Sequence, residues 1–136
     1  MCSDGKTCRF ATAVLSVGAI ATNLSAAEPR FTPTQICKAG IAVVMGRDPG
    51  TMKIDRVQKD VVFLSYVRAG DRKRWTYKCK LEGQKILWGA DDGRWRTHPA
   101  DSVITFDTET ASLMVVERFS DGSSTKKTFT VQQLGK

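Results

Sequence analysis

Short apolar segments separated by turn-forming residues fill the chain after Gly50. Segments of this length, divided by Gly, Asp and Pro at intervals of about 8–12 residues, are typical of an antiparallel meander. We predict about six to eight short strands, drawn from the segments 52–57, 61–67, 74–81, 85–90, 94–97, 103–107, 113–119 and 125–131. The most apolar of them, 61–67, is expected to lie centrally in the sheet.

The segment 74–81 alternates most strictly between apolar and polar positions. Successive side chains of a strand point to opposite faces of the sheet. We therefore expect one face to carry the apolar residues, which are Trp75, Tyr77, Cys79 and Leu81. The other face should carry the polar residues, which are Arg74, Thr76, Lys78 and Lys80. The apolar face is predicted to lie toward the core and the polar face toward solvent.

Before Gly50 the apolar positions follow helical spacing instead. Thr32 can cap a helix, Pro33 suits its first turn, and Gln35 completes a capping box. Apolar residues then recur every three or four positions until Gly46, which can end the helix in a left-handed conformation. We predict an α+β fold, in which one N-terminal helix of about 13 residues packs on the apolar face of the sheet.

Residues 1–27 have the composition of a secretory signal peptide. Basic residues precede an apolar, small-residue segment at 10–24, and Ser25-Ala26-Ala27 follows as a cleavage site. The apolar segment is shorter and richer in Ala, Thr and Ser than a membrane span, which needs about 20 apolar residues. We predict cleavage at this site, export to the periplasm or outside the cell, and a single domain over 28–136. An uncleaved N-terminal anchor is the alternative.

Removal of the signal peptide would leave two of the four cysteines, Cys37 and Cys79. In an oxidising compartment, an even pair in a small domain is typical of a disulfide. The bond would join the predicted helix to the apolar face of the sheet, and the chain-entropy model gives it about 4 kcal/mol of stabilisation. A metal site made of these cysteines and His98 is disfavoured, because the three residues form no paired ligand motif.

The chain carries 21 Lys and Arg against 14 Asp and Glu, a net charge of +7. This balance favours encounters with anionic partners, although it also serves solubility alone. Basic residues and tryptophans gather in the middle of the chain, where the candidate ligand-binding residues are Arg72, Arg74, Trp88, Arg94, Trp95 and Arg96. Arginine pairs with phosphate or carboxylate, and an indole offers a flat face to a base or sugar ring. The alternative is structural: the tryptophans belong to the core and the arginine stems cover them.

No linear catalytic motif accompanies the one histidine, His98. No serine lies in a nucleophile elbow, and the glycines fall singly at turns rather than in a phosphate-binding loop. Asp91 and Asp92 precede Gly93, which fits a tight turn better than an acid–base pair. We therefore expect no metal, no cofactor and no enzymatic activity.

These observations favour a small exported, non-enzymatic binding domain whose ligand is an anionic polymer, a glycan or a protein of the cell envelope. A structural or assembly component of the envelope is one alternative, and an enzyme whose site leaves no linear motif is another. A large exposed apolar patch would favour assembly, and a pocket with convergent polar groups would favour an enzyme or small-ligand site. A basic strip with an exposed tryptophan would favour polyanion binding.

Overall fold

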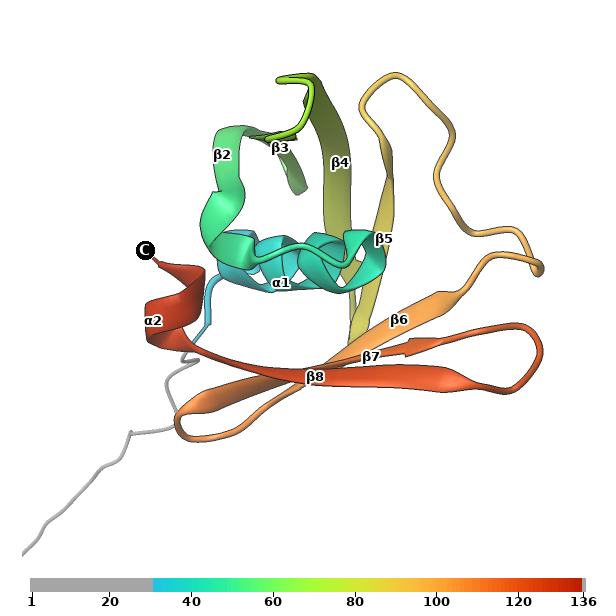
Figure 1. Cartoon of the computed structure of the whole chain (residues 1–136). Coiled ribbons are helices and arrows are strands. Elements are labelled where there is room, and N and C mark those ends of the chain that lie inside the picture. The colour runs from blue at the N-terminus through green and yellow to red at the C-terminus, as the bar shows by residue number, and fades with distance from the viewer. Residues whose placement is uncertain (1–30, 136) are drawn as a thin grey trace, which may run out of the picture.

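The computed structural model describes residues 31–135 (Figure 1), so the predicted signal peptide lies outside the described residues. The elements are α1 (Pro33–Met45), η4 (Pro49–Thr51), β2 (Met52–Gln58), β3 (Val61–Val67), β4 (Arg74–Glu82), β5 (Lys85–Ala90), β6 (Val103–Thr108), β7 (Ser112–Arg118), β8 (Ser124–Thr130) and α2 (Val131–Leu134). The predicted α+β class is confirmed, because α1 packs on a 7-stranded antiparallel sheet whose strands follow chain order. None of the described helices has the length and apolar character needed to cross a membrane.

Helix α1 begins and ends where its sequence predicts. The Thr32 side chain accepts a hydrogen bond from the Gln35 N–H at 3.2 Å, and Gln35 Oε1 accepts one from the Thr32 N–H at 2.9 Å. At the other end Gly46 has a φ of 64°, a left-handed conformation that favours glycine. A Cβ on Gly40 would lie 2.9 Å from the Ile86 side chain, so this glycine lets α1 approach β5 closely.

The inner face of the sheet packs on α1 through the residues predicted for it. Cys37 of α1 and Cys79 of β4 form a disulfide with Cα atoms 5.9 Å apart, and both are fully buried. The Tyr77 hydroxyl donates to Met45 Sδ at 3.1 Å. Burial, followed by the neighbouring Tyr66, raises the pKa of Tyr77 to about 12. The predicted disulfide and the predicted inward face of β4 are confirmed.

The sheet has two parts that meet at a narrow junction. Strands β2 to β5 pair along most of their lengths, and so do β6 to β8. Between the two parts, β5 and β6 are aligned only at Lys85 and Thr105. In Figure 1, β4 and β5 stand upright while β7 and β8 run across, and α1 contacts strands of both parts. The loop 91–102 crosses the space that opens where β5 and β6 diverge.

Three sequence predictions are wrong. Strand β3, the most apolar segment, lies second from the edge of the sheet and not at its centre, because β2 alone lies beyond it. The segment Arg94–Thr97 is part of the loop 91–102 and not a strand, although it alternates as a strand would. The Arg96 N–H of this segment donates to the Trp88 carbonyl oxygen of β5 at 2.8 Å, but the segment forms no ladder with β5. Val131 starts α2 instead of ending the last strand. Thr130 and Gln133 form a capping box there, a signal that the sequence contained.

Candidate ligand-binding site on the outer face

The outer face of β4 carries the polar half of its alternating residues. Arg74 is exposed as predicted, whereas Lys78 and Lys80 are half-buried. Their Nζ atoms lie 4.8 and 4.7 Å from the ring centre of Trp95, within the range of cation–π attraction. Lys78 Nζ also donates to the Gly93 carbonyl oxygen at 2.6 Å. The two lysines therefore hold the loop 91–102 against the sheet instead of extending into solvent.

Gly89 of β5 allows the loop to lie this close. It pairs with Lys78 in the β4–β5 register, so a side chain at this position would point to the outer face. A Cβ added there would lie 2.3 Å from the carbonyl oxygen of Arg94, a backbone atom that cannot move without the loop. A residue other than glycine would therefore push the loop away from the sheet.

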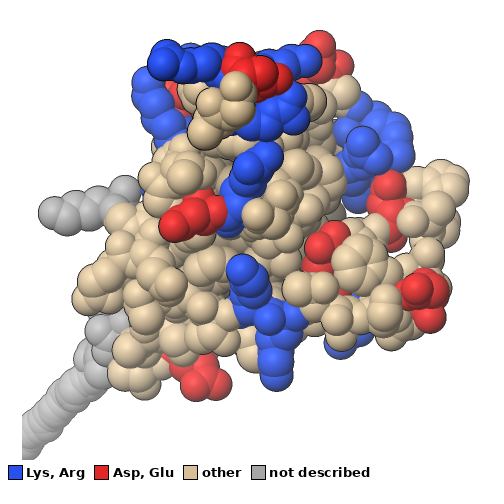
Figure 2. All heavy atoms as spheres, in the orientation of Figure 1, with Lys and Arg blue, Asp and Glu red and all other residues tan. Residues whose placement is uncertain are grey.

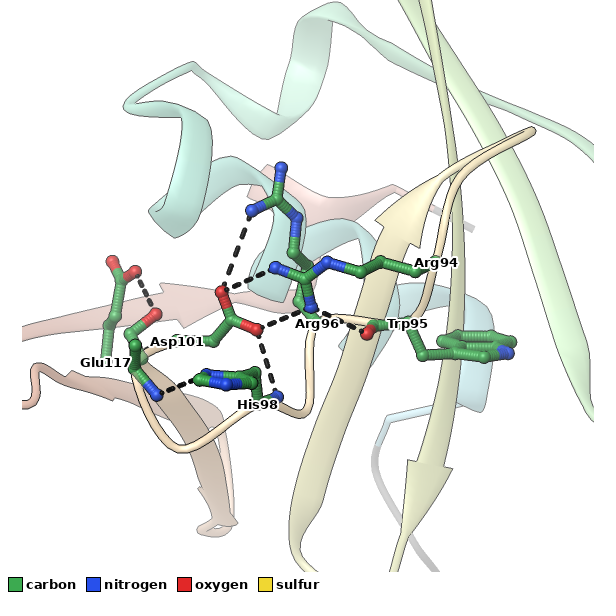
Figure 3. Close-up of polar contacts among 8 residues, drawn as sticks. Arg94, Trp95, Arg96, His98, Asp101 and Glu117 are labelled. Atoms are coloured by element: carbon green, nitrogen blue, oxygen red, sulfur yellow. Dashed lines mark hydrogen bonds and ion pairs between the residues drawn. The ribbon is translucent and has the colours of Figure 1, made fainter.

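Asp101 holds the arginines of the loop together (Figure 3). Its carboxylate accepts two hydrogen bonds from the Arg94 guanidinium at 2.9 and 3.3 Å and one from the His98 N–H at 3.0 Å. Arg96 Nη1 lies 3.7 Å from the same carboxylate. Hydrogen bonds from Arg94 are the largest cause of a lowered pKa of Asp101. In Figure 3 both arginines turn toward Asp101, and Trp95 points the other way.

Two further contacts secure the end of the loop before β6. The Ser102 hydroxyl donates to Glu117 Oε2 at 2.7 Å, and Glu117 is buried on β7. His98 Nδ1 accepts a hydrogen bond from the Ala100 N–H at 3.0 Å. The loop is thus tied to β4 at one end and to β7 at the other.

A cavity of about 370 Å³ lies in the angle where β5 and β6 diverge, and we call it the loop hollow. Its charged and aromatic lining consists of Lys80, Glu82, Lys85, Trp95, Arg96 and His98. Leu87 of β5 and Val103 of β6 contribute apolar wall. Within residues 31–135, Lys80 and Lys85 form no ion pair. Lys85 is exposed, whereas the Lys80 ammonium keeps its charge while it lies against the Trp95 ring. The cavity therefore combines cationic side chains with aromatic and apolar ones. Such a lining suits an anionic group that is attached to a ring or an aliphatic chain.

The structure places Arg72 and Arg74 away from the loop hollow. Arg72 lies in the β3–β4 turn with a φ of 63°, and Arg74 pairs with Asp55 of β2 at 3.0 Å. In the same turn Arg68 hydrogen-bonds to Asp71 and lowers the pKa of that carboxyl. Figure 2 shows Lys and Arg side chains gathered at the end of the molecule where β3 turns into β4, with acidic side chains among them. The cations of this turn are therefore partly paired.

The other candidate residues are divided between the two faces of the sheet. Trp88 is half-buried on the inner face, with its ring edge-on to Tyr77 at 6.0 Å and the Arg96 guanidinium 5.4 Å from its centre. Arg94 is engaged by Asp101. Of the six residues singled out in the sequence, Trp95 and Arg96 are the two that line the loop hollow. Whether any of the six binds a ligand stays a prediction.

Sequence reasoning missed Lys80, Lys85 and Asp101 as members of this site. The alternation of β4 did place Lys80 on the outer face, and Lys85 follows a turn that could have returned it to the same face. Asp101 had no local signal, because its role depends on a loop that folds back on itself. Pairing between strands and loop closure, and not composition, brings these residues together.

No group of three or more His, Cys, Asp or Glu side chains among the described residues could hold a metal ion. Comparisons of the chain with known protein families, with curated proteins and with solved structures find no match.

Proposed function

We propose that the protein is an exported, non-enzymatic binding domain that holds an anionic group of a polymeric ligand in the loop hollow. The observation that carries this proposal is the lining of the hollow, where Lys80, Lys85 and Arg96 share one cavity with the Trp95 indole. Carboxylate, sulfate or phosphate groups pair with such cations, and a ring of the ligand can pack on the indole.

Two features support export and binding. The buried Cys37–Cys79 disulfide favours an oxidising compartment, in agreement with the signal peptide predicted at 1–27. The charged groups of the hollow are mainly cations, because Lys80, Lys85 and Arg96 face the single carboxylate of Glu82. His98 accepts a hydrogen bond from the backbone of its own loop. An acid–base catalyst would instead need a partner group positioned to exchange protons with a substrate.

Binding of heparin, used as a sulfated glycan probe, tests the proposal. Lys80→Gln with Lys85→Gln should lower the affinity about tenfold or more at low salt, because two charge-assisted contacts are lost. The slope of log affinity against log salt should flatten by about two, since each contacting charge releases counterions on binding.

Lys126→Gln with Lys127→Gln on β8 is the charge-matched control, and it should leave the affinity unchanged. Both of these lysines are exposed on the edge strand β8, and neither lines the loop hollow. Thermal unfolding of each variant checks that the fold persists. The proposal is refuted if the wild-type protein does not bind heparin at low salt, or if the control pair weakens binding as much as the test pair.

A further inference from the structure

A second hollow lies on the same outer face, at the end of the β2–β3 hairpin. Its volume is about 540 Å³, and it is lined by Gln58, Lys59, Asp60, Val61 and Phe63. Phe63 belongs to the outer face because it pairs with Lys78 in the β3–β4 register. We call this cavity the hairpin hollow. Like the loop hollow, it combines an aromatic ring with a lysine.

Cations and aromatic rings alternate across the strands between the two hollows. Arg56 of β2 pairs with Phe63 of β3, and its guanidinium carbon lies 3.9 Å from the Phe63 ring centre. Phe63 pairs in turn with Lys78 of β4, whose Nζ lies 4.8 Å from the Trp95 ring centre. The row is therefore cation, ring, cation, ring, and it runs at right angles to the strands.

The length of this row exceeds what one small anion can cover. Neighbouring strands are about 4.8 Å apart, so the two spacings from Arg56 on β2 to Lys78 on β4 span about 10 Å, and Trp95 of the loop lengthens the row further. Lys80 lies two residues from Lys78 on the same face and lines the loop hollow, so these two lysines separate the hollows. A ligand that fills both hollows must be an extended chain.

The charges of the outer face suit an acidic chain. Register and alternation place Lys53, Arg56, Arg74, Lys78, Lys80 and Lys85 on the outer face of β2 to β5. Asp55 forms an ion pair with Arg74. Glu82 lines the loop hollow, and Asp60 lines the hairpin hollow. Cations therefore outnumber carboxylates along the row.

We infer that the outer face is a two-subsite groove for a linear acidic polysaccharide, which lies across the strands from the loop hollow to the hairpin hollow. This inference rests on the proposed function and names its ligand class. Sugar rings pack beside Trp95 and Phe63, whose rings also contact these cations. Acidic groups pair with Lys78 and Lys80 between the two rings and with Arg56 on the other side of Phe63. A polysaccharide is favoured over a single-stranded nucleic acid because the disulfide favours a compartment outside the cytosol.

Heparin fragments of two lengths test the two-subsite groove. Arg56→Gln with Phe63→Leu alters the hairpin hollow and keeps an apolar side chain of similar size at the half-buried position. This variant should bind a heparin decasaccharide about tenfold more weakly, because the second contact no longer adds to the first. Its affinity for a heparin disaccharide should match that of the wild-type protein. Arg56→Gln alone, which keeps the Phe63 ring but removes the guanidinium beside it, should produce part of the same loss.

The controls separate this inference from the proposed function. Lys127→Gln should affect neither fragment, and Lys80→Gln with Lys85→Gln should weaken both. If the hairpin variants bind both fragments as well as the wild-type protein does, the second subsite is refuted and the loop hollow remains. If the wild-type protein binds neither fragment at low salt, the proposed function fails first. If oligo(dT) binds more tightly than the heparin decasaccharide, with the same dependence on Arg56 and Phe63, the assignment of the ligand as a polysaccharide is refuted.

Discussion

The two faces of β4 and β5 hold aromatic residues by different forces. On the inner face, Tyr77 and Trp88 lie edge to face and pack against the core beneath α1. On the outer face, Trp95 is held by the ammonium groups of Lys78 and Lys80 and by the close approach of its loop to β5. The inner contacts depend mainly on buried apolar area, although Arg96 also lies over Trp88, and the outer ones depend mainly on charge.

This difference predicts a division of roles between the faces. Burial of a large apolar side chain contributes about 1.5–3 kcal/mol, whereas an exposed ion pair contributes about 0–1 kcal/mol. Changes on the inner face should therefore alter the free energy of unfolding. Changes on the outer face should alter binding and the position of the loop 91–102 while most of the stability is kept.

The largest expected effect is on the inner face. Cys37→Ala with Cys79→Ala removes a cross-link between positions with a sequence separation of 42, which should lower the free energy of unfolding by about 4 kcal/mol. Urea unfolding of the variant and the wild-type protein measures the loss. Heparin affinity should stay unchanged under conditions where the variant is folded. A loss of stability below about 1 kcal/mol, the average for an ordinary substitution, would contradict the structural role of the disulfide.

An intermediate effect is expected from Gly89→Ala, which changes no charge. The new Cβ would meet the Arg94 carbonyl oxygen, so the loop should move outward at a cost of about 1–3 kcal/mol. Trp95 should become more exposed, seen as a red shift of tryptophan fluorescence, and heparin affinity should fall. Gly70→Ala is the matched control, because a Cβ there has open space and should change neither property. Unaltered fluorescence in Gly89→Ala would show that the loop keeps its place despite the new Cβ. A red shift without a loss of affinity would show that the loop position does not matter for binding.

The smallest effect concerns the acid limit of stability. The pKa of Asp101 is lower in the folded protein than in the unfolded chain, chiefly because of Arg94. Its ionised form therefore contributes stability at neutral pH, and this contribution is lost as the pH falls below about 4 toward the lowered value. In Asp101→Asn the melting temperature should depend less on pH in this window. Asp71 titrates in both proteins, so the difference between their pH profiles isolates Asp101. Identical profiles would argue against the ion pair.

Local patterns were sufficient to predict most of the fold. The capping box at Thr32 and the left-handed position at Gly46 set the limits of α1, and the alternation of β4 indicated which face meets the helix. These signals work because caps and strand periodicity depend on residues a few positions apart. The second capping box, formed by Thr130 and Gln133, is equally local and starts α2 where the last strand was expected to continue.

The candidate site was predicted less well than the fold. Arg94, Trp95 and Arg96 resembled a strand because they alternate in polarity, and the structure shows the same alternation in a loop. Alternation in polarity indicates which side chains of a segment point in the same direction. It does not indicate whether the backbone of a neighbouring strand is close enough to hydrogen-bond with that segment. Here β5 and β6 diverge, so the segment contacts side chains of other elements instead.

By itself the sequence determined the α+β class, the helix with its caps, the inward face of β4 and the pairing of Cys37 with Cys79. Only the tertiary structure decided which cations stay unpaired and which tryptophan reaches the outer face. Both outcomes depend on contacts between distant segments, such as Lys78 with Gly93 and Glu117 with Ser102. Loop closure brings such groups together, and no local pattern records it because the partners meet only after the sheet has formed.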